Sequence, residues 1–130
     1  MRKFILLALF IGHIFAFTNI EATKTNIQKL KIPIVDIRLP SEWKATGTIP
    51  NAKKITFFTN KGRINPNFLN ELAKAHITKS SKFAIICRTG HRSKVASQIL
   101  EANGYKNVIN LKGGMFNLFK SMLKGLDNGK

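Results

Sequence analysis

The part of the sequence best suited to chemistry begins at its single cysteine, Cys87. The six residues that follow it, Arg-Thr-Gly-His-Arg-Ser, are basic, polar and glycine-bearing. A tight loop of this kind turns backbone N–H groups and guanidinium groups toward one point, which favours a thiolate over a thiol and stabilises a bound anion. The segment therefore predicts a nucleophilic cysteine that attacks, or carries part of, an anionic substrate.

Several residues of this loop also have a simpler interpretation. Cys87 can be a buried residue that ends a strand, and Arg92 can be a solvated charge in the first turn of a helix. A cation at a helix N-terminus opposes the helix dipole, however, and an anion held there would explain Arg92. Gly90 permits a tight backbone turn. For His91, contact with substrate and simple exposure to solvent both stay open.

The elements around the loop place it where ligands bind. Residues 83–87 (Phe-Ala-Ile-Ile-Cys) form a continuous apolar run, typical of a strand that is covered on both faces. Residues 93–102 predict an amphipathic helix, with Asn103-Gly104 as its stop. The carboxyl end of a strand in an open α/β sheet is the usual ligand site, so topology alone puts Cys87 there.

The remaining segments complete an α/β pattern. Strands are predicted at residues 32–37, 55–58 and 108–111, and helices after Asn65-Pro66 and from Gly114 onward. Residues 18–30 are polar and predict only a leader or a first short element. The apolar stripe of the last helix, which includes Met115, Phe119 and Met122, is expected to lie in the core. Strands that alternate with helices indicate a mainly parallel sheet flanked by helices.

Three motifs in this order resemble those of the rhodanese-type sulfurtransferases. The first runs through residues 34–38, 42–43 and 47–52, the second is the Cys-x-x-Gly-x-Arg-Ser loop at 87–93, and the third covers 104–108 and 111–115. The resemblance extends from about residue 32 to residue 123. One departure is Asn51, where the family commonly has glycine, and it falls in a mainly structural loop.

The resemblance implies a five-stranded, mainly parallel sheet with helices on both faces. It also implies that Cys87 takes a sulfane sulfur from a donor such as thiosulfate, becomes a persulfide, and passes the sulfur to a thiol or cyanide. The loop residues would bind the donor and its leaving group, and three further residues would support the site. The implied binding residues are Arg88, Thr89, Gly90, His91 and Arg92, and the implied supporting residues are Asp36, Arg38 and Ser93.

The N-terminus predicts export. Arg2 and Lys3 precede an almost wholly apolar run at residues 4–17, which is too short to cross a bilayer comfortably and matches a signal-peptide core. We therefore expect a signal peptide within residues 1–22, with Ala16 and Ala22 as candidate cleavage positions. A single rhodanese-like domain would follow at 23–130, in the periplasm or outside the cell. The alternatives are an N-terminal membrane anchor and a buried first helix.

Charge and composition limit the partners. The formal net charge is +16, but the lysines are scattered and there is one Trp and one Tyr, which argues against a nucleic-acid module. The expected partners are a small anionic sulfur donor and a thiol or protein acceptor, and the expected state is a monomer. Three scattered histidines and one cysteine predict no metal site, and no cofactor is expected.

Three other functions compete with sulfur transfer. A phosphatase of similar fold would place five residues between its cysteine and arginine, whereas four lie between Cys87 and Arg92. A disulfide oxidoreductase would need a second cysteine. A sulfur carrier or binding module of low turnover in an envelope pathway would share the same loop, and the sequence leaves that alternative open.

Overall fold

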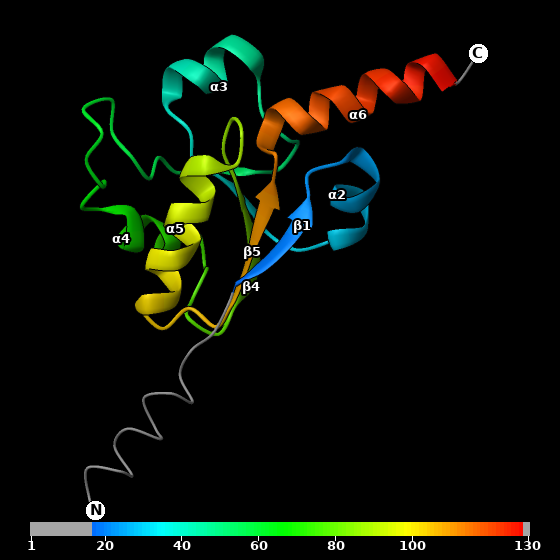
Figure 1. Cartoon of the computed structure of the whole chain (residues 1–130). Helices are drawn as coiled ribbons and strands as arrows, with labels where there is room; N and C mark the ends of the chain where they lie inside the picture. Colours follow the sequence, from blue (N-terminus) through cyan, green and yellow to red (C-terminus); the bar gives the residue numbers. More distant parts are fainter. Residues whose placement is uncertain (1–16, 129–130) are drawn as a thin grey trace, which may run out of the picture.

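A five-stranded, wholly parallel sheet forms the centre of the computed structural model, which describes residues 17–128 (Figure 1). The strands are β1 (Thr18–Glu21), β2 (Ile34–Asp36), β3 (Lys53–Lys54), β4 (Lys82–Ile86) and β5 (Asn107–Lys112). Their order in the sheet is β1-β5-β4-β2-β3, so β4, which leads into Cys87, is the middle strand. The expected fold class is confirmed.

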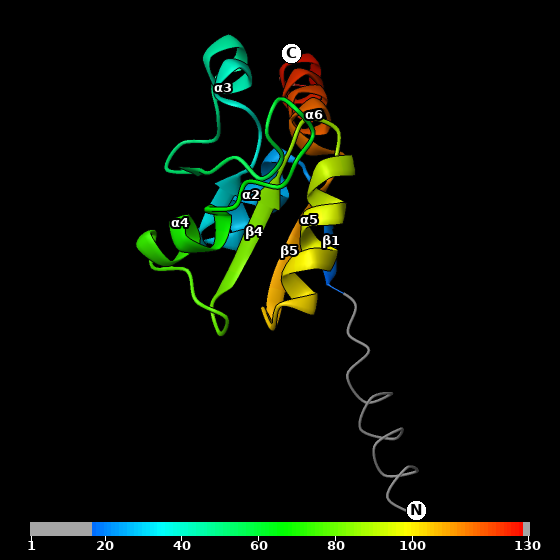
Figure 2. The same ribbon diagram turned by 90° about the vertical axis from the view of Figure 1, so that its left-hand side faces the viewer.

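Helices cover both faces of this sheet. They are α2 (Lys24–Leu30), α3 (Pro40–Thr46), α4 (Phe68–Lys74), α5 (His91–Ala102) and α6 (Gly114–Asn128). Helices α4 and α5 lie on one face and α2 and α6 on the other, while α3 lies beyond the carboxyl ends of the strands (Figures 1 and 2). Helix α3 and the start of α6 thus border the edge at which β4 delivers Cys87.

The alternation of side chains along β4 builds two cores. Phe83, Ile85 and Cys87 point into the core under α4 and α5, and Ala84 and Ile86 point into the core under α2 and α6. All five are at most 1% exposed. A middle strand buried on both faces explains the continuous apolar run in the sequence.

The edges of the sheet differ from the prediction. The second predicted strand, at 55–58, was misplaced: β3 is formed by Lys53 and Lys54, whose side chains are exposed. Ile55 and Phe57 follow it and are buried, and their N–H groups donate to the carbonyl oxygens of Asp36 and Ile37, both at 3.1 Å. The apolar pattern therefore marked the buried continuation of the chain instead of the strand itself. Asn51 has a φ of 67°, a left-handed conformation that Asn tolerates better than most residues, which accounts for the asparagine in place of the family's glycine.

The polar stretch at 18–30 contains both β1 and α2. Strand β1 pairs with β5 at the edge of the sheet, and the N–H of the buried Ala22 donates to the carbonyl oxygen of Lys112 at 2.9 Å. Cleavage after Ala16 would keep this strand, whereas cleavage after Ala22 would remove it. Residues 1–16 of the expected signal peptide at 1–22 lie outside the described residues, and its last part, from residue 18 to residue 21, forms β1. Within residues 17–128, no helix is long and apolar enough to cross a membrane.

Candidate active site

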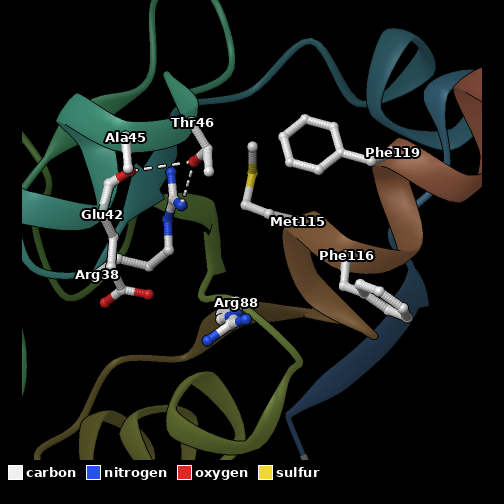
Figure 3. Close-up of a pocket in the computed structure, with 8 residues that line it drawn as sticks. All are labelled: Arg38, Glu42, Ala45, Thr46, Arg88, Met115, Phe116 and Phe119. Carbon is white, nitrogen blue, oxygen red and sulfur yellow. Dashed lines mark hydrogen bonds between the residues drawn. The ribbon is translucent and has the colours of Figure 1, made fainter.

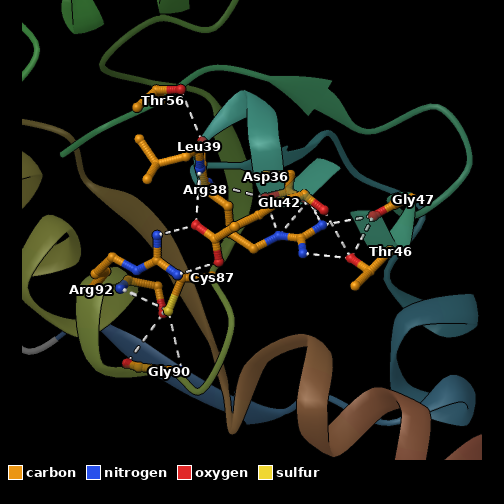
Figure 4. Close-up of polar contacts among 11 residues, drawn as sticks. Asp36, Arg38, Leu39, Glu42, Thr46, Gly47, Thr56, Cys87, Gly90 and Arg92 are labelled. Carbon is orange, nitrogen blue, oxygen red and sulfur yellow. Dashed lines mark hydrogen bonds and ion pairs between the residues drawn. The ribbon is translucent and has the colours of Figure 1, made fainter. Parts of the chain in front are cut away.

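Cys87 lies at the carboxyl end of β4 with its sulfur held inside the following loop. The N–H groups of Gly90 and Ser93 donate to Sγ at 3.1 and 3.3 Å (Figure 4). The Ser93 hydroxyl lies 3.4 Å from Sγ and donates to the carbonyl oxygen of Gly90 at 3.2 Å. Cys87 is 1% exposed, so a reactant has to enter this ring of amides to meet the sulfur.

The conformation of Gly90 makes the ring of amides possible. Gly90 has a φ of 96° and is the N-cap of α5, so its own N–H and that of Ser93 in the first turn of the helix both point at the sulfur. A Cβ at this position would lie 2.8 Å from the backbone nitrogen of Gly113, so any other residue would clash as well as strain the backbone. The N-terminal dipole of α5 adds a partial positive charge beside Sγ, which favours a negative charge on the sulfur.

The N-terminus of α6 fixes the other side of the loop. The N–H groups of Met115 and Phe116 donate to the carbonyl oxygens of Cys87 and Arg88, both at 2.9 Å. A Cβ on Gly114 would lie 2.5 Å from the carbonyl oxygen of Cys87. The glycine pair of the third motif therefore allows α6 to sit directly on the backbone of the cysteine loop.

Arg92 is bound by an acidic residue that the sequence analysis did not assign to the site. Its Nη1 and Nη2 donate to Oε1 and Oε2 of Glu42 in α3, at 2.7 and 2.8 Å (Figure 4). The hydrogen bond from Arg92 lowers the pKa of Glu42, and the bond to Glu42 raises the pKa of Arg92. Arg92 was expected to bind the donor anion, but its guanidinium group is occupied by this carboxylate. The pair joins the cysteine loop to α3.

Replacing Glu42 by Gln should change the pH dependence of stability. The pKa of Glu42 is depressed in the folded protein, so its pairing stabilises the fold above the ordinary value of 4.5 and this contribution is lost as the pH falls through the lower folded value. We expect the Glu42→Gln variant to be less stable than the wild type at pH 7, by about 1 kcal/mol. This difference should shrink progressively as the pH falls below 4.5.

Urea unfolding midpoints of both proteins between pH 3 and 7 measure this effect. Glu71→Gln is a control on α4, outside the site, and its stability difference from the wild type should not follow the same pH profile. A constant difference between Glu42→Gln and the wild type over the whole range would show that the Arg92–Glu42 pair does not contribute as an ion pair.

Asp36 and Arg38 form a buried cluster beneath α3. Asp36 accepts hydrogen bonds from the Arg38 side chain, at 2.7 Å for the shortest (Figure 4). It also accepts one from the hydroxyl of Thr48 at 2.6 Å. Arg38 also donates to Thr46 Oγ1 and to the Gly47 carbonyl oxygen, at 2.8 and 2.7 Å. At 0% and 2% exposed, the two charged residues hold α3 and its following loop against the end of β2.

A pocket of about 390 Å³ opens beside the cysteine loop, between α3 and α6 (Figure 3). Its lining consists of Arg38, Glu42, Ala45, Thr46, Arg88, Met115, Phe116 and Phe119. Arg88 is thus the loop arginine that reaches the pocket, while Thr89 and His91 are exposed beside it. Within residues 17–128, no three His, Cys, Asp or Glu side chains are grouped as a metal site would require.

Comparisons with known proteins agree with this geometry. The family model described as "Rhodanese-like domain" matches residues 19–121. A sulfurtransferase of Allochromatium vinosum is 37% identical over 82 residues, which cover 63% of this chain and 66% of that protein. A rhodanese domain-containing protein of Drosophila melanogaster is 30% identical over 83 residues, covering 62% of this chain and 75% of that protein.

A solved structure extends the comparison to the fold. A rhodanese-like domain protein from Staphylococcus aureus matches with a TM-score of 0.60 at 30% identity, over 78% of this chain and 90% of that one. The chain spans about two thirds of the length of the first two curated relatives, one of which is the Allochromatium sulfurtransferase.

Proposed function

Because the chain belongs to the rhodanese-like domain family, we propose that it is a sulfurtransferase that carries sulfur on Cys87 as a persulfide. The similarity to a sulfurtransferase supports a role in sulfur transfer. The observation that carries the proposal is the pair of N–H groups, from Gly90 and Ser93, that donate to Cys87 Sγ. Donors aimed at a sulfur stabilise a negative charge on it, either as a thiolate or as a persulfide.

The proposed reaction has two steps. The Cys87 thiolate attacks the outer sulfur of thiosulfate, the S–S bond of the donor breaks, and sulfite leaves with the electron pair of that bond. A thiolate or cyanide ion then attacks the outer sulfur of the Cys87 persulfide, and the Cys87 thiolate leaves. This is covalent catalysis that divides one sulfur transfer into two displacements.

The loop residues have different parts in this proposal. The amides around Gly90 hold the sulfur, and Arg88 at the pocket attracts the anionic donor. Thr89 and His91 flank the mouth of the loop, and the Ser93 hydroxyl lies next to Sγ. Arg92 acts through Glu42 by fixing the loop to α3, and the Asp36–Arg38 cluster supports α3 from below.

The test is steady-state turnover with thiosulfate and cyanide, measured as thiocyanate and sulfite. We expect both products in equal amounts and negligible hydrolysis of an aryl phosphate. The carrier alternative predicts that Cys87 is loaded with sulfur once, without turnover on any small thiol or cyanide. Rapid phosphate release without sulfur loading would overturn the proposal in favour of phosphatase chemistry.

Turnover with thiosulfate should fall as the salt concentration rises. The donor is a dianion and the chain has a net charge of +16, so long-range attraction raises the rate of encounter at low salt. We expect kcat/KM for thiosulfate to drop about threefold to tenfold between roughly 0.02 and 0.3 M NaCl. Discharge of the persulfide by 2-mercaptoethanol, whose reacting thiolate carries one negative charge instead of two, should change less. An equal response in the two reactions would contradict electrostatic steering.

We also propose that the protein acts in the periplasm or outside the cell, as a monomer. The apolar run at 4–17 after Arg2 and Lys3 supports export, and the position of β1 favours cleavage near Ala16 over cleavage after Ala22. Expression of the full chain, cell fractionation and N-terminal sequencing test this proposal. An uncleaved chain in the membrane fraction would replace it with the anchored alternative.

A further inference from the structure

Helix α6 presents an apolar stripe to solvent next to the cysteine loop. Phe116, Phe119 and Leu123 are spaced by three and four residues and therefore lie along one side of the helix. Their exposed fractions are 57%, 36% and 61%, and the neighbouring Met122 is 43% exposed. Phe119 and Met122 were expected in the core from the sequence pattern, and for both that expectation was wrong. We call these four residues the α6 stripe.

The α6 stripe is continuous with the active site. Phe116 and Phe119 line the pocket together with Arg88, and both come from α6, on the side opposite α3 (Figure 3). The hydrogen bonds from Met115 and Phe116 to the carbonyl oxygens of Cys87 and Arg88 fix the start of the stripe relative to the sulfur. A molecule that lies on the stripe is therefore guided toward the cysteine loop.

The charges around the α6 stripe are positive. Lys120 Nζ lies 5.3 Å from the centre of the Phe116 ring, Lys124 is exposed one turn farther along, and Arg88 is at the pocket end. The acidic residue in the pocket lining, Glu42, is neutralised by Arg92. Among the side chains that the structure describes, the α6 stripe thus combines apolar groups with neighbouring cations, and such a surface complements a segment that carries apolar and acidic side chains.

Resting on the proposed sulfurtransferase function, we infer that the α6 stripe and the adjoining pocket are the docking surface for the acceptor. The acceptor is a protein whose reactive cysteine lies in an accessible segment with apolar and acidic residues on either side. Its thiolate attacks the outer sulfur of the Cys87 persulfide, the S–S bond of the persulfide breaks, and Cys87 leaves as a thiolate. The acceptor cysteine becomes the new persulfide, so no external oxidant or reductant is needed.

Three other occupants fit less well. A small molecule would fill the pocket but leave Met122 and Leu123 uncovered, since neither lines it. A second copy of the chain would bring two strongly basic molecules together. A membrane laid on the α6 stripe would cover the α6 side of the pocket. It would therefore hinder a sulfur acceptor from reaching the cysteine loop.

The experiment measures discharge of the Cys87 persulfide by synthetic peptides. The acidic apolar probe is acetyl-Asp-Phe-Cys-Leu-Glu-Asp-amide. One control peptide has Lys at the acidic positions, and another has Ser at the Phe and Leu positions. We expect the first peptide to react with a kcat/KM about tenfold above that of either control, after correction for the pKa of each peptide thiol.

Variants locate the effect on α6. The double variant Met122→Ser, Leu123→Ser should lose most of the preference for the acidic apolar peptide and react normally with 2-mercaptoethanol. The charge reversal Lys120→Glu, Lys124→Glu should turn the preference toward the basic peptide. Leu69→Ser is the matched control, because Leu69 is 40% exposed on α4, which covers the opposite face of the sheet, and it should change neither reaction.

The outcomes separate this inference from the proposed function. Failure to form a persulfide at all would overturn the proposed function. A normal persulfide that reacts equally with all three peptides, or a preference that the double variant keeps, would overturn the docking surface alone. The docking surface would also be overturned if the wild type showed no preference for the acidic apolar peptide and the double variant abolished another interaction. Loss of dimerisation would assign the α6 stripe to a second copy of the chain, and loss of binding to anionic phosphatidylglycerol vesicles would assign it to a membrane.

Discussion

Replacing Cys87 by serine should reduce sulfite release from thiosulfate by at least about a thousandfold, because the hydroxyl is a far weaker nucleophile and cannot hold a transferred sulfur. The change removes the only sulfur atom that the Gly90 and Ser93 amides contact, while the side chain keeps a similar size. The measurement is sulfite release with cyanide as acceptor, compared between the wild type and Cys87→Ser.

The comparison of sulfite release requires that the Cys87 variant keeps the fold of the wild type. Cys87 is buried among apolar residues, so a matched Cys87→Ala variant separates loss of the nucleophile from burial of a hydroxyl group. Both variants should give the far-UV circular dichroism spectrum of the wild type and the same background rate. Sulfite release by either variant within tenfold of the wild type would mean that the sulfur passes through another group.

The second large effect is expected for Asp36→Ala. This substitution removes the carboxylate that Arg38 contacts through Nε and Nη2, and leaves a buried guanidinium group without a counterion. Breaking a buried pair from one side costs about 3–5 kcal/mol. That is a large part of the total stability of a small domain, so the urea midpoint should fall sharply or the protein should be unfolded at room temperature.

The exposed pair of Glu21 and Lys112 provides the control. Its charged atoms are 3.9 Å apart and the side chains are 57% and 66% exposed, so Glu21→Ala should cost less than about 1 kcal/mol. A second variant, Thr48→Val, removes one hydrogen bond to Asp36 while leaving the ion pair, and should fall between the two. Equal costs for Asp36→Ala and Glu21→Ala would show that the Asp36–Arg38 cluster does not hold the end of β2.

The centre of the fold and the cysteine loop were predictable from the sequence for a physical reason. Strand β4 is buried on both faces, so its residues are continuously apolar, and the helix after it has an amphipathic pattern with a clear glycine stop. The loop between them is short and depends on local chemistry, namely Gly90 and the following amides. These signals all lie in the segment from residue 83 to residue 104.

The parts that the sequence did not reveal depend on contacts between distant segments. Strands β1 and β3 lie at the edges of the sheet, where side chains are exposed and the apolar pattern is lost. Glu42 meets Arg92 across 50 residues of sequence, and no local pattern pairs them. Glu42 belongs to the first of the three motifs and lies in the first turn of a helix that begins with a proline, but neither feature indicates which residue it pairs with.

The apolar residues of α6 illustrate a limit of periodicity. Met115 and Leu118 are buried, as expected for an apolar stripe, but Phe119 and Met122 on the adjoining side of the helix are exposed to solvent. In Figure 1, the carboxyl-terminal half of α6 projects away from the body of the domain. Periodicity reports which residues are apolar together, but it does not show how far around the helix, or how far along it, the core extends.

The most direct test of the central claim is the intact mass of the protein after treatment with thiosulfate and removal of the excess donor. We predict a gain of one sulfur atom on the wild type, located in the peptide that contains Cys87 and reversed by a reductant, and no gain on Cys87→Ser. An unchanged mass of the folded wild type, or a gain that persists in Cys87→Ser, would contradict it.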